Sequence, residues 1–354
     1  MIESIGFFER WIIALERPQP PDRLERLTHW VQTVLPAPLL NLTTASADAS
    51  FRRYFRVFCA SGSYIVMDAP PSHEDCQPFI HVARLFRAAG ANTPEILAQN
   101  LTEGFLLLSD FGDTTYLAAL DTNPAESADT LYRDANAALI KIQSASQAGE
   151  LPDYDAALLS RELNLFPEWY LQRHLGIALT AEQQNILDAT FARILANTLA
   201  QPKVYVHRDW HSRNLMLTTT GNPGVLDFQD AVYGPITYDL ASIYKDAYIR
   251  WDEERILDWM IRYWEAARKA DLPVQADFGE FYRDFEWMGV QRHIKVLGIF
   301  ARLCHRDGKQ GYLQDMPRVM DYLRKTCARY NGLGDFLRLL DAIEGKTLAS
   351  GYTF

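Results

Sequence analysis

Polar and apolar positions in the first third of the chain alternate at the period of a β-strand. Residues 51–59 place alternate side chains on opposite faces, and Ser61-Gly62 then turns the chain into another strand at 64–67. Three more strands are expected, over 39–45 and beginning at Pro94 and at Gly104. The pattern therefore predicts a region of short strands joined by turns in the N-terminal part of the chain.

Other stretches repeat apolar residues at the 3.6-residue period of a helix. Helices are expected at 1–16, 22–35, 77–89, 128–144, 285–303, 317–330 and 335–344. In the segment 285–303, Arg292 falls on the same stripe as the apolar residues. A guanidinium that faces a core needs an anionic partner, which is either a protein carboxylate or a bound ligand. The sequence leaves both possibilities open.

The strongest chemical signal is a polar motif that follows the apolar run 204–206. The run ends in His207-Arg208-Asp209, and Asn214 comes five positions after Asp209. A Gly-Asn turn then separates two short apolar segments that can pair as a hairpin, which would bring Asn214 and Asp227 to the same end. Amide and carboxylate oxygens suit Mg²⁺, and a nearby carboxylate suits an attacking hydroxyl. The motif indicates a phosphoryl-transfer site.

Two other interpretations of the motif are open. His207, Asp209 and His211 alternate along the chain, as the ligands of a transition-metal hydrolase could, but that site would leave Asn214 and Asp227 without a function. The polar residues could instead satisfy one another in a buried turn. His207 itself fits a structural hydrogen-bonding residue of the loop better than a catalyst.

Composition and charge limit the class of protein. The 354 residues are 48% hydrophobic and 23% charged, which is typical of a globular chain long enough for two lobes. A net charge of −10 argues against a nucleic acid or an anionic membrane as partner. The four cysteines lie far apart, and no signal peptide or membrane-length apolar run is present. We therefore expect a cytoplasmic protein.

The spacing from Asp209 to Asn214 and on to Asp227-Phe228 resembles that of the protein-kinase-like fold, in its aminoglycoside phosphotransferase and choline kinase branch. Longer strings are similar to those of the bacterial anomeric N-acetylmuramate/N-acetylglucosamine kinases of cell-wall recycling; they lie at 48–56, 64–71, 165–170, 225–240 and 291–303. The resemblance covers nearly the whole chain. It implies an α+β, two-lobed fold, with an antiparallel-sheet N-lobe over 1–108 and a mainly helical C-lobe over 109–354.

The resemblance also implies an activity. The enzyme would use ATP and Mg²⁺ to phosphorylate the anomeric hydroxyl of N-acetylmuramate and N-acetylglucosamine, and it would act as a monomer on small molecules. Asp209 would be the catalytic base, Asn214 and Asp227 would hold the metal, and His207 and Asp239 would support the loop. A kinase of the same fold for an aminoglycoside or a choline-like amine stays open, as does a non-catalytic nucleotide-binding scaffold.

Several binding residues follow from the same resemblance. The loop 46–50 lies where phosphate is covered in such folds, and Ser50 adds a hydroxyl. Backbone groups from Leu108 to Asp110 would contact the adenine. The lysine expected in the third strand is missing from 64–68, so Arg53 or Arg52 is proposed to hold the nucleotide phosphates instead.

The substrate side is predicted from aromatic and charged residues. The segment 161–174 mixes flat apolar rings with charged groups, as a sugar pocket requires, and the resemblance makes Glu168 a candidate contact. His211 and Asp230 are the candidates near the motif. Arg292 would offer a planar, bidentate partner for the lactyl carboxylate of N-acetylmuramate.

Overall fold

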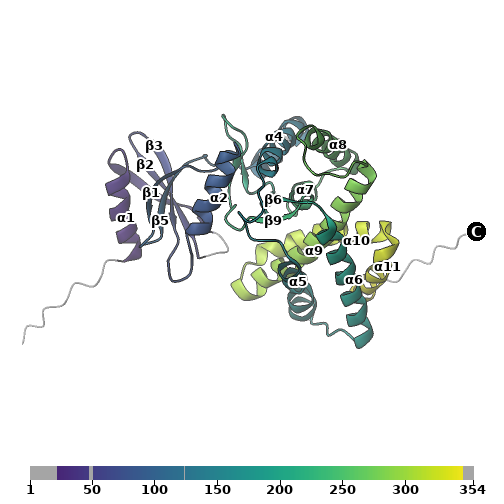
Figure 1. The fold of residues 1–354 in the computed structure, drawn as a ribbon. Coiled ribbons are helices and arrows are strands. Elements are labelled where there is room, and N and C mark those ends of the chain that lie inside the picture. The colour runs from purple at the N-terminus through teal and green to yellow at the C-terminus, as the bar shows by residue number, and fades with distance from the viewer. Residues whose placement is uncertain (1–21, 48–50, 123, 346–354) are drawn as a thin grey trace, which may run out of the picture.

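The computed structural model describes residues 22–47, 51–122 and 124–345 of the chain. A five-stranded antiparallel sheet lies at one end of the molecule, and helices make up most of the other end (Figure 1). The predicted α+β fold is therefore confirmed. The predicted helix at 1–16 and the candidate Ser50 lie outside the described residues.

The sheet is built from the strands that the alternating pattern predicts. They are β1 (Leu39–Ala47), β2 (Arg53–Cys59), β3 (Gly62–Asp68), β4 (Ile96–Asn100) and β5 (Phe105–Ser109). Neighbours pair antiparallel in the order β1-β2-β3-β5-β4. Gly62 has a φ of 136°, a left-handed value that glycine adopts without strain where β2 turns into β3.

A helix covers each face of the sheet. Helix α1 (Arg23–Val34) packs Leu27 and Val31 against apolar side chains of β2, β3 and β5. A capping box formed by Asp22 and Glu25 fixes where this helix begins. Helix α2 (Gln77–Ala88) belongs to the other cluster, which contains the opposite-face residues Met67, Leu106 and Leu108. The sheet is thereby buried on both sides.

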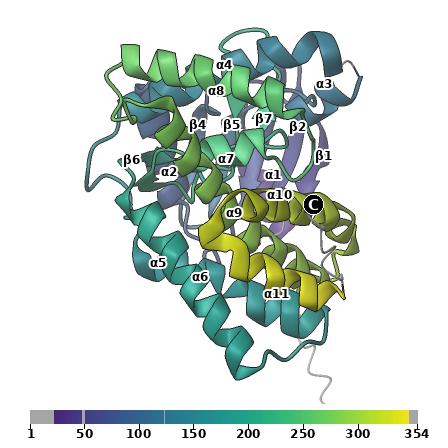
Figure 2. The same ribbon diagram turned by 90° about the vertical axis from the view of Figure 1, so that its right-hand side faces the viewer.

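The helical part is organised around α9 (Phe278–Asp307), which is buried along most of its length. Figure 2 shows α10 and α11 on the side away from the sheet. The other helices of this part are α3 (Tyr116–Thr122), α4 (Pro124–Ser144), α5 (Ala156–Leu163), α6 (Ala181–Ala200), α7 (Tyr238–Tyr244), α8 (Glu253–Lys269), α10 (Met316–Arg329) and α11 (Gly334–Glu344). Short helices of other types are η1 (Phe166–His174), η2 (Gln310–Asp315) and η3 (Asn331–Leu333).

Two small strand pairs follow α6 in the chain. β6 (Lys203–Val206) pairs with β9 (Val232–Pro235), and β7 (Leu215–Met216) pairs with β8 (Gly224–Val225), which confirms the predicted hairpin. The second segment ends earlier than the expected 228, because Asp227 takes a left-handed φ of 60°. The division of the chain into lobes at 108/109 stays a prediction. None of the helices in the described ranges combines the length and apolar character needed to cross a bilayer.

Candidate active site

Asp239, at the start of α7, anchors the loop that follows β6. Its two carboxylate oxygens accept the backbone N–H groups of His207, at 2.7 Å, and Arg208, at 3.0 Å. Arg208 has a φ of 76°, a strained conformation that such anchoring maintains. Burial raises the pKa of Asp239 to about 7, although the two N–H donors act in the opposite direction.

His207 ties the loop to the hairpin. Its Nε2 lies 2.9 Å from the carbonyl oxygen of Leu226, and its Nδ1 accepts the backbone N–H of Asp209 at 3.2 Å. The ring is fully buried, and burial lowers its pKa to about 4. A neutral, doubly bonded imidazole positions the neighbouring residues, which agrees with the supporting function expected from the sequence.

Asp209 faces the cavity with a side chain that is 41% exposed. Its Oδ1 lies 3.7 Å from Nη2 of the buried Arg292. Partial loss of hydration within the cavity acts to raise the pKa of Asp209, but the charges of Lys295, Arg292 and other nearby cations outweigh this effect and hold that pKa well below its usual range. The group is therefore a carboxylate at neutral pH, ready to accept a hydrogen bond from a hydroxyl.

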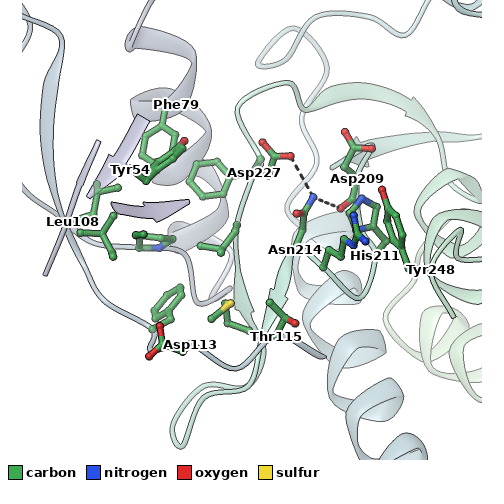
Figure 3. Close-up of a pocket in the computed structure, with 18 of the residues that line it drawn as sticks. Tyr54, Phe79, Leu108, Asp113, Thr115, Asp209, His211, Asn214, Asp227 and Tyr248 are labelled. Atoms are coloured by element: carbon green, nitrogen blue, oxygen red, sulfur yellow. Dashed lines mark hydrogen bonds between the residues drawn. The ribbon is translucent and has the colours of Figure 1, made fainter. Parts of the chain in front are cut away.

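Asn214 and Asp227 lie side by side at one end of the hairpin (Figure 3). The amide nitrogen of Asn214 donates to Oδ2 of Asp227 at 3.3 Å and to the carbonyl oxygen of Asp209 at 3.1 Å. Gln229, which the sequence did not single out, donates to the other oxygen of Asp227 at 2.7 Å. Adjacent amide and carboxylate oxygens fit a hard divalent cation that keeps water or phosphate oxygens as its remaining ligands.

These residues open into a cavity of about 660 Å³. At one end, apolar side chains from the sheet and α2 face side chains of the hairpin; they are Tyr54, Ile65, Phe79, Leu108, Met216 and Leu226. A slot of this kind suits a flat aromatic base. Asp209, His211 and Tyr248 lie on the other side of Asn214 and Asp227 (Figure 3). The walls of that end continue into α9 and η2, through Val296, Ile299, Phe300, Leu303 and Tyr312.

The predicted nucleotide residues are only partly brought together. Leu108 and Asp110 line the cavity at the end of β5. Arg53 and Arg52 do not, because Arg53 pairs with Asp68 at 2.5 Å and Arg52 pairs with Glu74 at 2.9 Å. Neither arginine reaches the cavity in this structure, and the assignment of either one to the nucleotide phosphates stays a prediction.

Arg56 is the arginine of β2 that lines the cavity, and it was not predicted. Its side chain lies 2.7 Å from Asp110 and also pairs with Asp113. Strand alternation puts Tyr54 and Arg56 on the same face, two residues apart, so this placement was available from the pattern.

The predicted substrate residues also separate into two groups. His211 and Arg292 line the cavity, whereas Glu168 and Asp230 are exposed and lie outside its lining. Glu168 is carried by η1, and Asp230 follows the hairpin beyond Gln229. Of the two partners left open for Arg292, the structure supplies the protein carboxylate, Asp209.

A buried charge network behind the loop escaped the sequence analysis. Glu162 of α5 lies 3.0 Å from Nζ of Lys295 and pairs with Arg208. Lys295 and Arg292 both donate to the hydroxyl of Tyr238, at 3.0 and 3.4 Å. The helical spacing of the buried Leu159, Glu162 and Leu163 could have placed Glu162 on the inner face, but no motif marked its partners.

The hydrolase interpretation finds no support in the geometry. Within the ranges that the structure describes, no three His, Cys, Asp or Glu side chains come close enough together to hold a metal ion. His207 is turned toward Leu226 and away from His211, whose ring instead packs edge-on against Tyr248 at 5.3 Å.

Two structural comparisons test the fold. The choline kinase LicA from Streptococcus pneumoniae superposes with a TM-score of 0.60 at 12% identity, covering 87% of this chain and 99% of that one. An ADP-bound aminoglycoside phosphotransferase gives a TM-score of 0.55 at 13% identity, covering 85% and 98%. At these identities the likeness concerns the fold alone, and it confirms the kinase-like architecture.

Sequence comparisons find relatives of much higher identity. A relative from Neisseria meningitidis serogroup B, named N-acetylmuramate/N-acetylglucosamine kinase, is 50% identical over 94% of this chain and 100% of its own length. A relative of the same name from Pseudomonas putida is 46% identical over the same two shares. Residues 41–278 match the model of the phosphotransferase enzyme family. The chain therefore belongs to the phosphotransferase enzyme family, together with these kinases.

Proposed function

We propose that this chain transfers the γ-phosphoryl group of ATP, with Mg²⁺, to the anomeric hydroxyl of N-acetylmuramate and N-acetylglucosamine. The observation that carries the proposal is the convergence of Asp209, Asn214 and Asp227 on one cavity, through contacts of 3.1 and 3.3 Å. The names of relatives at 46–50% identity support the choice of sugars. The product would be a sugar 1-phosphate.

The chemistry assigned to the chain is orientation and charge placement. Asp209 accepts a hydrogen bond from the anomeric hydroxyl and aims its oxygen at the γ-phosphorus. As the new P–O bond forms, the bond to the bridging oxygen of ADP breaks and the hydroxyl proton passes to Asp209. Magnesium held by Asn214 and Asp227 would offset the charge of the polyphosphate. A strongly ionised Asp209 suits this reaction, because phosphoryl transfer with a loose transition state needs little early proton removal.

The far end of the cavity offers groups that a sugar can use. Phe300 and Tyr312 supply flat apolar surface for the C–H face of a pyranose ring. Nδ1 of His211 is buried and has no hydrogen-bond partner among the described residues. Burial lowers the pKa of His211, so its neutral ring can bond a sugar hydroxyl. Such an enzyme would work as a cytoplasmic monomer that needs only its two substrates and the metal.

Phosphorus NMR of the reaction with ATP, Mg²⁺ and each sugar tests the proposal. We expect a new phosphomonoester signal coupled to the anomeric proton, and ADP in equal amount. Choline and an aminoglycoside serve as competing acceptors in parallel reactions. Preferred phosphorylation of either amine would overturn the sugar assignment, and absence of ATP consumption with every acceptor would favour a nucleotide-binding scaffold.

A further inference from the structure

The sugar end of the cavity contains two arginines, Arg213 and Arg292, and the structure gives them different surroundings. Arg292 is 5% exposed. Its Nη1 donates to the carbonyl oxygen of Arg208 at 2.6 Å and lies 3.4 Å from the hydroxyl of Tyr238, while its Nη2 faces Asp209. A guanidinium with these protein partners is suited to holding the catalytic loop and the charge of Asp209.

Arg213 belongs to the loop itself, between Asp209 and Asn214, and its side chain is exposed. Its guanidinium carbon lies 3.7 Å from the centre of the Tyr248 ring and 6.0 Å from that of Tyr312. Within the part of the chain that the structure describes, no carboxylate forms an ion pair with Arg213 within 4.0 Å. This cation therefore lines the cavity, is stacked on an aromatic ring, and has no anionic partner in the protein.

Two acids near this loop, Asp315 and Asp246, bond to other donors. Asp315 pairs with Arg318 at 3.1 Å. Asp246 accepts the backbone N–H groups of Ser212 and Tyr248, both at 2.9 Å. The charge of Arg213 acts to lower the pKa of Asp315, but the oxygens of both acids bond other donors. The in-plane N–H groups of a stacked guanidinium remain directed outward, which is the geometry for a bidentate bond to a carboxylate.

We propose that Arg213 binds the carboxylate that distinguishes N-acetylmuramate from N-acetylglucosamine, and that Arg292 does not. The inference rests on the proposed function, since it assumes that both sugars occupy this cavity. Hydrogen bonds from His211 to Asp209 and from Asn214 to His211 fold the loop tightly, at 3.0 and 2.9 Å. Arg213 and Asp209 thus lie four residues apart in one tight loop, and both side chains line the cavity that the sugar would occupy.

The test compares the two sugars in the wild-type enzyme and in Arg213→Gln. We expect the ratio of kcat/KM for N-acetylmuramate to that for N-acetylglucosamine to fall about tenfold in the variant, mainly through the KM for N-acetylmuramate. The methyl ester of N-acetylmuramate, which lacks the negative charge, should be used about equally by both proteins. Arg213→Lys keeps the positive charge but loses the two parallel N–H donors of the guanidinium. Its ratio of kcat/KM values for the two sugars should therefore be intermediate.

A matched control is Arg250→Gln. Arg250 also stacks on a tyrosine, Tyr322, at 5.1 Å, but lies outside the cavity lining. Its removal should leave the ratio unchanged, and thermal unfolding should show that both glutamine variants are folded. An unchanged ratio in Arg213→Gln, or an equal loss with both sugars, would overturn the assignment while leaving the kinase proposal intact. A wild-type enzyme that phosphorylates neither sugar would overturn both.

Discussion

At the scale of single residues, the site depends on a carboxylate that is surrounded by cations. Asp209 lies 3.7 Å from Arg292, and Lys295 also acts on it electrostatically. The two positive charges together keep the pKa of Asp209 low. A carboxylate of this kind is a weak base, so we infer that its main contribution is to orient the acceptor hydroxyl.

Replacing Asp209 by Asn removes the negative charge and the proton acceptor with little change of shape. We expect kcat to fall by about 10²- to 10⁴-fold, the usual worth of a positioned acid–base group. Steady-state kinetics with N-acetylglucosamine and ATP measure the effect, and the melting temperature checks the fold. Near-normal turnover in a folded variant would remove Asp209 from its assigned function.

Replacing Asp227 by Asn should act through the metal. The variant loses a charged oxygen ligand, so the Mg²⁺ concentration that gives half-maximal activity should rise at least about tenfold. Titration of activity with Mg²⁺ measures this value. Asp230→Asn is a nearby control, because Asp230 is exposed and outside the cavity lining. Similar shifts in both variants would mean that the effect is not specific to Asp227.

At the scale of elements, the packing of α9 against η1 positions the wall that carries Arg292. A Cβ added at Gly298 would lie 2.5 Å from the backbone carbon of Leu165 and 2.6 Å from its oxygen, which immediately precede η1. Backbone atoms cannot move aside as a flexible side chain can. The close approach of α9 to this segment therefore depends on a glycine.

Gly298→Ala should destabilise the protein by about 1–3 kcal/mol, as overpacking usually does, despite the better helix propensity of alanine. Urea unfolding measures the loss. Gly311→Ala is the matched control, because a Cβ there meets no atom within 4 Å. If the two variants had equal stability, the steric argument for Gly298 would be wrong.

Elements were predictable from the sequence where a single period extends over several residues. The strands at 51–59 and 64–67 and the long helix over 285–303 follow from their own apolar patterns, and turn chemistry gave the hairpin. The π-helical form of η1 was not predictable, because its apolar and charged residues fit an ordinary helix equally well. Its exposed Glu168 was chosen by resemblance alone.

Contacts between charged residues that lie far apart in the sequence could not be predicted either. Arg56 meets Asp110 across 54 positions, and Glu162 meets Lys295 across 133, and no local pattern links such pairs. The motif from Asp209 to Asp227 could be identified because its residues lie within one loop and one hairpin. The sequence therefore grouped Asp209, Asn214 and Asp227 and placed Arg292 on the inner face, but it did not pair Arg56 with Asp110 or Glu162 with Lys295.

At the scale of the whole molecule, buried histidines make stability depend on pH. Burial lowers the pKa of His207 to about 4 and that of His293 to about 3, whereas an unfolded histidine titrates near pH 6.5. Below about pH 6.5 the unfolded chain binds more protons at these sites, so stability falls until the folded pKa values are reached. Asp239, with its pKa raised to about 7, takes up a proton in the folded state and partly offsets this loss.

His293→Gln isolates one of these terms, since glutamine does not titrate. Between pH 7 and pH 5 the wild-type protein should lose about 2 kcal/mol more of its free energy of unfolding than the variant. Urea unfolding at the two pH values gives both slopes, and the difference between them cancels the contribution of Asp239. Parallel pH dependence in the two proteins would show that folding does not lower the pKa of His293.

The hairpin that carries Asn214 and Asp227 is attached at both of its sides. Asn222 at its tip donates to Asp134 at 2.7 Å and to Tyr116 at 2.8 Å, while Val225 donates to the carbonyl oxygen of Asn92 at 2.8 Å. These anchors tie the hairpin to α3 and α4 and to the connector that follows α2. We infer that these anchors fix the position of Asn214 relative to Asp227 before any ligand enters, so the proposed metal site needs no rearrangement to accept a nucleotide.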